Sequence, residues 1–271
     1  RRPPRSTLHN TLFPYTTLRF DEALESDNHA VPHSQNLESG YDPVDPNIER
    51  FTLPLAPAGA AWSNTVDLTK YIQTQLSDGV APGGKRVISE KNLMRTRAPQ
   101  IEISANAQYG LGWVISVYKG AIVISHNGNT MGFTSELAFM PEKDLGITVL
   151  ANAQNANAFS GSVRTRLWEL AFDLRNRSLP DAKFQRDQAT KVLAKMRQKL
   201  SDVDTREVGT YVGKYGNPDL GELEVSLDDG ELVLDAGEFS TRVRKMTEDG
   251  GAGDVSYVAV DPPVAGSKFE F

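Results

Sequence analysis

Two parts of the chain, residues 109–152 and 207–271, consist of short runs of β-branched and aromatic residues separated by turns rich in glycine or aspartate. Such runs are typical of antiparallel strands joined by tight turns. Between the two parts, over residues 155–200, apolar residues recur at helical spacing. The sequence therefore predicts an α+β fold, in which an antiparallel sheet flanked by helices is followed by a small all-β antiparallel domain.

The expected elements can be placed along the chain. Asn64 and Ser89 are N-cap residue types, and each is expected to start a helix ahead of the first β part. Four strands are expected in that part, at 114–118, 121–126, 136–140 and 146–150. A helix burying Val163, Leu167, Leu170, Ala171 and Leu174 should follow, and then a second amphipathic helix over 181–200. The second β part is expected to hold strands at 211–215, 223–227, 231–234, 242–246 and 256–260.

Charge and pattern change at the same places along the chain. The net charge is +5 over residues 164–206 and −9 over residues 207–271. The sequence therefore predicts a basic helical linker followed by an acidic β domain. The expected segments are a tail at 1–20, a partial main domain at 21–178, a helical linker at 179–205 and a small β domain at 206–271, whose completeness the sequence leaves open.

The N-terminal quarter of the chain carries weaker signals. Residues 1–20 lack the continuous apolar centre of a signal peptide, and they are expected to be a disordered tail or sequence foreign to the protein. Residues 21–60 hold prolines at 32, 43, 46, 54 and 57, which predict an irregular surface segment.

Composition excludes several classes of function. The net charge of −6 and the pI near 5.3 argue against a nucleic-acid-binding protein. No apolar run reaches the roughly 18 residues of a membrane span, so no transmembrane segment is predicted. The chain has no cysteine, which removes disulfides and thiolate chemistry. His29 and His33 have metal-ligand spacing, but Pro32 interrupts the helix that this spacing needs, so neither a metal nor a cofactor is predicted.

A near match to a phosphate-binding loop is also rejected. Residues 79–85 are glycine-rich and end in Lys85, but Arg86 stands where a serine or threonine would hold magnesium. The segment also follows an expected helix instead of a strand.

An ordered set of short motifs carries a family resemblance. In chain order these are residues 57–63 followed by Asp67, then 109–113, 126–128, 132–133 and 146–152. Over residues 21–175 the chain resembles the C-terminal half of the serine β-lactamase-like family, which includes class C β-lactamases, penicillin-binding D-Ala-D-Ala peptidases and related esterases. The main domain at 21–178 is thus expected to be a partial β-lactamase-like domain. The last part resembles the small β domain often appended to these enzymes.

The resemblance implies a site around His126. The triplet His126-Asn127-Gly128 matches the His-x-Gly element of the family, which lies on a strand and lines one wall of the site. The strand backbone can pair with an extended substrate, His126 can attract a carboxylate or move a proton, and Gly128 allows close approach. By the same resemblance, the N–H of Asn129 is one oxyanion donor, and Asn127 and Thr130 contact substrate.

The nucleophile of the family is not found in this sequence. Its only Ser-x-x-Lys runs from Ser116 to Lys119, in an expected strand, where residues three apart point to opposite faces. Ser26 and Asn28 spell the relay motif, but they lie in the irregular segment with no nucleophile before them. The nucleophile and relay are therefore expected upstream of residue 21, and this chain alone is expected to lack acyl-transfer activity.

Two functions remain open from the sequence. In the first, the chain is the C-terminal part of a serine hydrolase that acts through an acyl-enzyme on a small-molecule or peptide acyl substrate. In the second, it is a non-catalytic relative that binds peptide or cell-wall fragments. The resemblance implies a periplasmic or extracellular location, and it leaves the substrate and the oligomeric state open.

Overall fold

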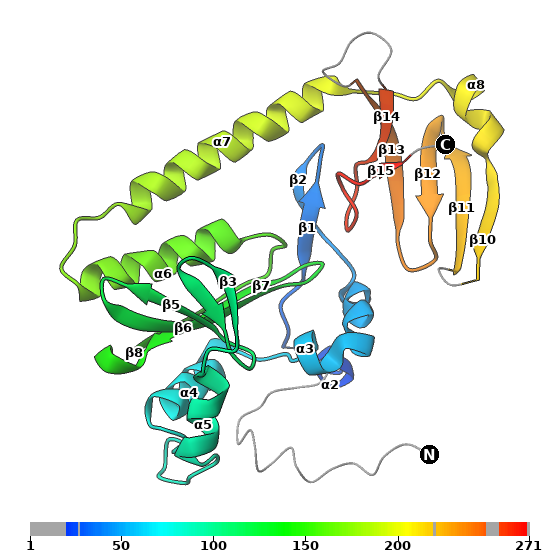
Figure 1. Cartoon of the computed structure of the whole chain (residues 1–271). Helices are drawn as coiled ribbons and strands as arrows, with labels where there is room; N and C mark the ends of the chain where they lie inside the picture. Colours follow the sequence, from blue (N-terminus) through cyan, green and yellow to red (C-terminus); the bar gives the residue numbers. More distant parts are fainter. Residues whose placement is uncertain (1–19, 27, 219–220, 248–254, 270–271) are drawn as a thin grey trace, which may run out of the picture.

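A computed structural model describes residues 20–26, 28–218, 221–247 and 255–269, and it contains the expected mixture of helices and antiparallel sheets (Figure 1). The expectations for residues 1–19 lie outside the described part. Phe20, which we had assigned to the tail, begins α2 (Phe20–Leu24) and is buried. Its ring packs edge-on against Trp62, with 6.1 Å between the ring centroids, and this contact explains the burial.

The first sheet has six antiparallel strands arranged in chain order. They are β3 (Ile101–Ser104), β4 (Ala107–Tyr109), β5 (Val114–Tyr118), β6 (Ala121–Asn129), β7 (Thr134–Met140) and β8 (Leu145–Ala151). The last four strands confirm the four that were predicted. The hairpin β3–β4 was missed because both strands are short: Ile101–Ser104 alternates apolar and polar residues over only four positions, and it is exposed along its whole length.

Helices cover both faces of this sheet. The predicted N-caps are confirmed: the side chain of Asn64 caps α4 (Thr65–Leu76) and that of Ser89 caps α5 (Glu90–Arg97). On the α4 face, Ile72 packs with Ile124 and Phe139. On the other face, Trp168 of α6 (Asn157–Ala171) packs among small and flexible side chains of β6 and β7.

The predicted buried stripe of α6 was partly wrong. Leu170 is 61% exposed and Val163 is 36% exposed, whereas Trp168 is only 2% exposed. The large indole ring fills the space above the sheet, and it turns the helix so that Trp168, with Leu167 beside it, faces inward.

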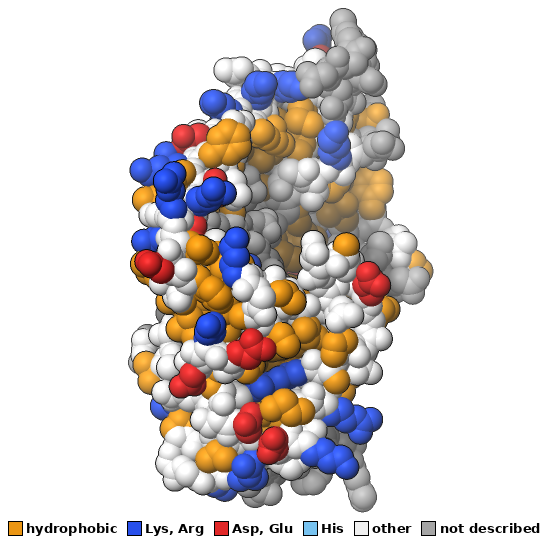
Figure 2. Space-filling view, turned by 60° about the vertical axis from the view of Figure 1, so that its left-hand side comes forward, with side chains coloured by type: hydrophobic (Ala, Val, Ile, Leu, Met, Phe, Trp, Pro, Cys, Tyr) orange, Lys and Arg blue, Asp and Glu red, His pale blue; other side chains and the backbone are white. Residues whose placement is uncertain are grey.

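The long helix α7 (Ser178–Lys199) confirms the predicted second helix and leads to the other sheet. Its middle is exposed, with Phe184 63% and Val192 57% exposed. Figure 2 shows this side of the molecule, with lysine and arginine side chains in the upper part, along which α7 runs, and further ones over the lower part. Among the described residues, no helix is long and apolar enough to cross a membrane.

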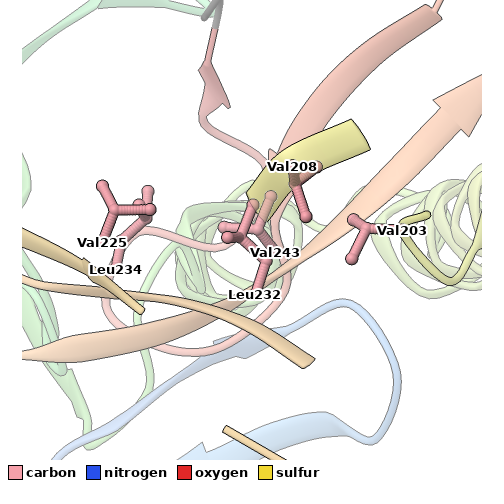
Figure 3. Packing of buried hydrophobic residues seen from close by; sticks show 6 residues of the cluster. All are labelled: Val203, Val208, Val225, Leu232, Leu234 and Val243. Carbon is pink, nitrogen blue, oxygen red and sulfur yellow. The ribbon is translucent and has the colours of Figure 1, made fainter. Parts of the chain in front are cut away.

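The second sheet is separate from the first and also antiparallel. Its main path runs through β10 (Gly213–Asn217), β11 (Gly221–Asp228), β12 (Glu231–Asp235), β13 (Ser240–Thr247), β14 (Val255–Ala259) and β15 (Lys268–Phe269), and β9 (Leu200–Ser201) pairs with β13. The short helices α8 (Thr205–Val208) and η3 (Gly209–Tyr211) lie between β9 and β10 in the chain. Figure 3 shows its core, where Val208 packs with Leu232 and Val243.

The segment expected to be irregular instead forms a hairpin. Strands β1 (His33–Asn36) and β2 (Gly40–Pro43) pair in register, followed by the short helices η1 (Pro46–Leu55) and α3 (Ala56–Gly59). Pro43 ends a strand, and Pro46 and Pro57 occupy the first turns of η1 and α3, where no N–H bond is lost. Pro54 lies inside η1, one residue before its end.

The tip of this hairpin is inserted into the second sheet. Leu37 is 2% exposed and packs with Met246, Val258 and Val260. Its N–H donates to the carbonyl of Val260 at 2.9 Å. Beside it, Asn36 Nδ2 donates to Asp261 at 3.1 Å, so the hairpin ties the second sheet to the N-terminal part of the chain.

We expect Leu37→Ala to lower the free energy of unfolding by about 2–5 kcal/mol, because it leaves a cavity in the core of the second sheet. The matched control is Leu55→Ala, since Leu55 is 61% exposed, and it should change stability by less than about 0.5 kcal/mol. Denaturant unfolding measures both. Equal effects of the two substitutions would show that the hairpin tip does not support the fold.

The ionised Asp261 should contribute to stability in a pH-dependent way. Burial acts to raise the pKa of Asp261, but hydrogen bonds and charge from Arg242 outweigh it, and the pKa lies below its usual 3.8. A depressed carboxyl pKa stabilises the fold above the unfolded-state pKa, and this contribution is lost as the pH falls through the lower folded-state value. At pH 7, Asp261→Asn should cost about 1–3 kcal/mol.

The cost of Asp261→Asn should shrink as the pH is lowered below about 4. The exposed turn residue Asp229, changed to Asn, is the control and should show a small, flat difference. A difference for Asp261→Asn that stays constant from pH 7 to pH 2 would contradict this assignment.

Candidate functional site

The C-terminal end of β6 has a neighbouring strand on one side only. Its ladder with β7 extends from Ile124 to Asn129, but its ladder with β5 ends at Ser125. Within the described part of the chain, no strand pairs with the β5 side of residues 126–129. The predicted His-x-Gly element therefore lies on a free strand edge.

The register shows which backbone groups point out from this edge. The N–H of Thr130 donates to the carbonyl of Phe133 at 3.0 Å, so these two residues form a hydrogen-bonded pair. Hydrogen-bonded and non-hydrogen-bonded pairs alternate along an antiparallel ladder. The N–H and C=O groups of Asn127 and Asn129 therefore point away from β7, toward the free side.

The side chains of the predicted site lie on both faces of the sheet. His126 and Gly128 lie on the α4 face, opposite Leu137 and Ser135, and a Cβ on Gly128 would come within 2.8 Å of the Ser135 hydroxyl. Asn127 and Asn129 lie on the α6 face. The four residues therefore do not present their side chains to one site, and what they share is their position on the free backbone edge of β6.

His126 is exposed and paired with a tyrosine. The Tyr109 hydroxyl lies 3.0 Å from His126 Nε2, and the two rings meet edge to face at 6.1 Å. A hydroxyl donating to Nε2 favours the tautomer that carries its proton on Nδ1. Tyr109 belongs to one of the family motifs in the sequence, but the sequence alone indicates no role for it, because nothing in it shows that the end of β4 lies beside β6.

The side chains of Asn129 and Thr130 are held by neighbouring groups. Asn129 Oδ1 accepts from the Thr134 hydroxyl at 2.8 Å, and its Nδ2 donates to Asn157. The Thr130 hydroxyl donates to Glu49 at 2.9 Å. Asn127, in contrast, is exposed. These contacts fix the end of β6 in place.

An ion pair between a buried carboxylate and a half-buried arginine lies next to the edge on the α6 face. Glu136, 4% exposed, is opposite Asn127 in the ladder and meets Arg164 of α6 at 2.5 Å. Burial raises the pKa of Glu136, while the charge and hydrogen bond of Arg164 oppose this effect. The pair connects α6 to the strand next to the candidate edge.

The other sequence candidates fall elsewhere. Ser116 lies within β5, and Lys119 lies in the turn after it, with φ of 52°. These two residues are therefore not on a helix, which agrees with the rejection of this Ser-x-x-Lys as the nucleophile motif. The Ser26 hydroxyl accepts from the N–H of Asn28 at 3.2 Å. In the described residues, no group of three or more histidine, aspartate or glutamate side chains could hold a metal ion.

The antiparallel sheet between helices, with a His-x-Gly strand edge, defines a protein of the serine β-lactamase and penicillin-binding class. The Beta-lactamase family model matches residues 17–172. This match covers more than half of the chain, so the chain belongs to the beta-lactamase family.

Two curated relatives and one solved structure show the extent of the similarity. "Unguisins hydrolase ungD'" of Aspergillus campestris is 26% identical over 217 residues, which are 72% of this chain and 38% of that protein. Penicillin-binding protein 4 of Amycolatopsis lactamdurans is 27% identical over 171 residues, 60% of this chain and 43% of that protein. The chain thus spans about two fifths of these relatives.

The octameric penicillin-binding protein homologue from Pyrococcus abyssi has a TM-score of 0.50 and 16% identity. The similarity covers 97% of this chain and 57% of that one. At this identity the likeness concerns the fold, and it extends over both sheets.

We expect Tyr109→Phe to change the tautomer and orientation of the His126 ring, because it removes the hydroxyl 3.0 Å from Nε2. Nitrogen chemical shifts of the imidazole ring measure this directly. Tyr118→Phe is the control, since the Tyr118 ring packs against Phe172. If the His126 shifts are the same in Tyr109→Phe and in the unchanged protein, the pair has no influence on the ring.

Proposed function

We propose that residues 126–129 of β6 form the substrate-binding wall of a serine hydrolase that acts through an acyl-enzyme on a peptide or small-molecule acyl substrate. The observation that carries this proposal is the free strand edge, where two backbone N–H groups point outward beside an exposed histidine. Family membership supports the reaction class.

The edge offers the donors that acyl transfer needs. An extended substrate can pair with the backbone of Asn127 as an added strand. The N–H of Asn129 lies two residues along on the same side, where it can donate to the oxygen of a tetrahedral intermediate. His126 can donate to a substrate carboxylate or transfer a proton, and Tyr109 orients its ring.

In this proposal the nucleophile comes from a segment upstream of residue 21. An acyl-enzyme needs an activated hydroxyl close to the oxyanion donors. The only Ser-x-x-Lys of the sequence cannot supply it, because Ser116 and Lys119 lie on a strand and in the turn after it. The chain therefore contributes the binding wall of the site.

A second candidate function follows from the same edge. A strand edge can capture an extended peptide without any nucleophile. A non-catalytic role in binding peptide or cell-wall fragments is consistent with the free edge, and the full coding sequence separates the two: Ser-x-x-Lys followed by Tyr-x-Asn upstream supports the hydrolase.

We expect binding of a D-Ala-D-Ala peptide to depend on the outward N–H of Asn127. Asn127→Pro removes this N–H at a position that makes no bond to β7, and Asn127→Ala keeps it. Calorimetric titration should show affinity reduced about tenfold by the proline and changed about twofold or less by the alanine. Equal effects of both variants, or none, would contradict pairing at this edge.

We also expect the chain alone to form no stable adduct with labelled penicillin or fluorophosphonate. The reason is the absence of a helix-borne Ser-x-x-Lys. Mass spectrometry of the intact chain is the measurement, with an active penicillin-binding protein as the positive control. Labelling of one serine that is blocked by excess penicillin would overturn the assignment of the nucleophile to another segment.

A further inference from the structure

Glu49 is a buried carboxylate that reaches the loop directly after the candidate edge. It lies on η1 and is 2% exposed. Its Oε1 accepts two hydrogen bonds, from the Thr130 hydroxyl and from the N–H of Gly132, each at 2.9 Å. Both donors belong to residues 130–133, the loop that joins β6 to β7.

The same loop is pressed against the start of the β1–β2 hairpin. The N–H of His33 donates to the Gly132 carbonyl at 3.3 Å, and the Ser34 hydroxyl donates to the carbonyl of Met131. A Cβ on Gly132 would lie 2.1 Å from the Cβ of Pro32. The loop therefore has very little room to move in this direction.

Burying Glu49 has a free-energy cost that its contacts must offset. Removal of the carboxylate from water raises its pKa, and the hydrogen bonds from Thr130 and Gly132 act in the opposite direction. A carboxylate buried in this way is retained only with hydrogen-bond donors. Both donors come from the loop beside the site. The burial of Glu49 is therefore offset only while the loop stays where its two donors can reach the carboxylate.

We propose that Glu49 is a positioning residue, which holds Thr130 and Gly132 so that the N–H of Asn129 keeps its outward direction at the candidate edge. The Thr130 N–H shares a peptide plane with the Asn129 carbonyl, and the plane that carries the Asn129 N–H is the next one, joined to it at the Asn129 Cα. A displaced loop therefore reaches this N–H through the φ and ψ angles of Asn129. That the Asn129 N–H matters for activity rests on the proposed function. That Glu49 holds the loop rests on the structure alone.

The test compares Glu49→Ala with Glu49→Gln. Glutamine keeps an acceptor oxygen for Thr130 and Gly132 without the buried charge, whereas alanine leaves both donors without it. Exposed Glu142, changed to Ala, is the control. The readouts are amide hydrogen exchange at Thr130, the amide chemical shifts of Asn127 and Asn129, and affinity for the D-Ala-D-Ala peptide.

In Glu49→Ala, we expect exchange of the Thr130 amide, which donates to Phe133 across the loop, to accelerate by about tenfold or more, because the loop loses the two hydrogen bonds that Glu49 accepts. Exchange at Ala138, in the centre of β7, should stay unchanged, which separates loop positioning from a general loss of stability. The Asn129 amide signal should shift and peptide affinity should fall about tenfold. Glu49→Gln and Glu142→Ala should resemble the unchanged protein.

Two results would overturn the inference: unchanged Thr130 exchange and Asn129 shifts in Glu49→Ala, or equal damage by Glu49→Gln and Glu49→Ala. If Glu49→Ala does not fold, Thr130→Val decides, because it removes one of the two donors and should give a smaller change of the same kind. If the unchanged protein binds no peptide, the proposed function fails, while exchange and chemical shifts still test Glu49.

Discussion

The β1–β2 hairpin is the contact on which the arrangement of the chain depends. At its tip, Leu37 is buried in the second sheet and bonded to Val260. At its base, Pro32 and His33 lie against Gly132, in the loop after the candidate edge. One short element thus contacts both the small β sheet and the loop that ends β6, and Figure 1 shows it standing between the two sheets.

This arrangement explains why a free strand edge can be a well-defined site. An unpaired strand end frays unless other contacts hold it. Here the ladder with β7 holds one side, the side chain of Asn129 is bonded to Thr134 and Asn157, and Glu49 holds the loop beyond. The outward backbone groups of Asn127 and Asn129 are fixed without a neighbouring strand on the other side.

Local signals in the sequence predicted much of the fold. The caps at Asn64 and Ser89, the strands around His126 and the strands of the last part follow from residue types within a few positions. The burial of Leu37 at the hairpin tip and the orientation of α6 depend on residues far away in the chain, so no local pattern indicates them. The contact of Tyr109 with His126 depends on how β4, β5 and β6 are arranged in the sheet. Glu49 was missed for the same reason, since its donors lie about 80 residues later.

The central claim is that substrate pairs with the free edge of β6. The most direct measurement is a backbone amide chemical-shift titration of the chain with a D-Ala-D-Ala peptide. We expect the largest changes at Asn127 and Asn129, with smaller changes at His126 and Tyr109. Changes confined to the hollow between Arg197 and Arg244, at the second sheet, would contradict it.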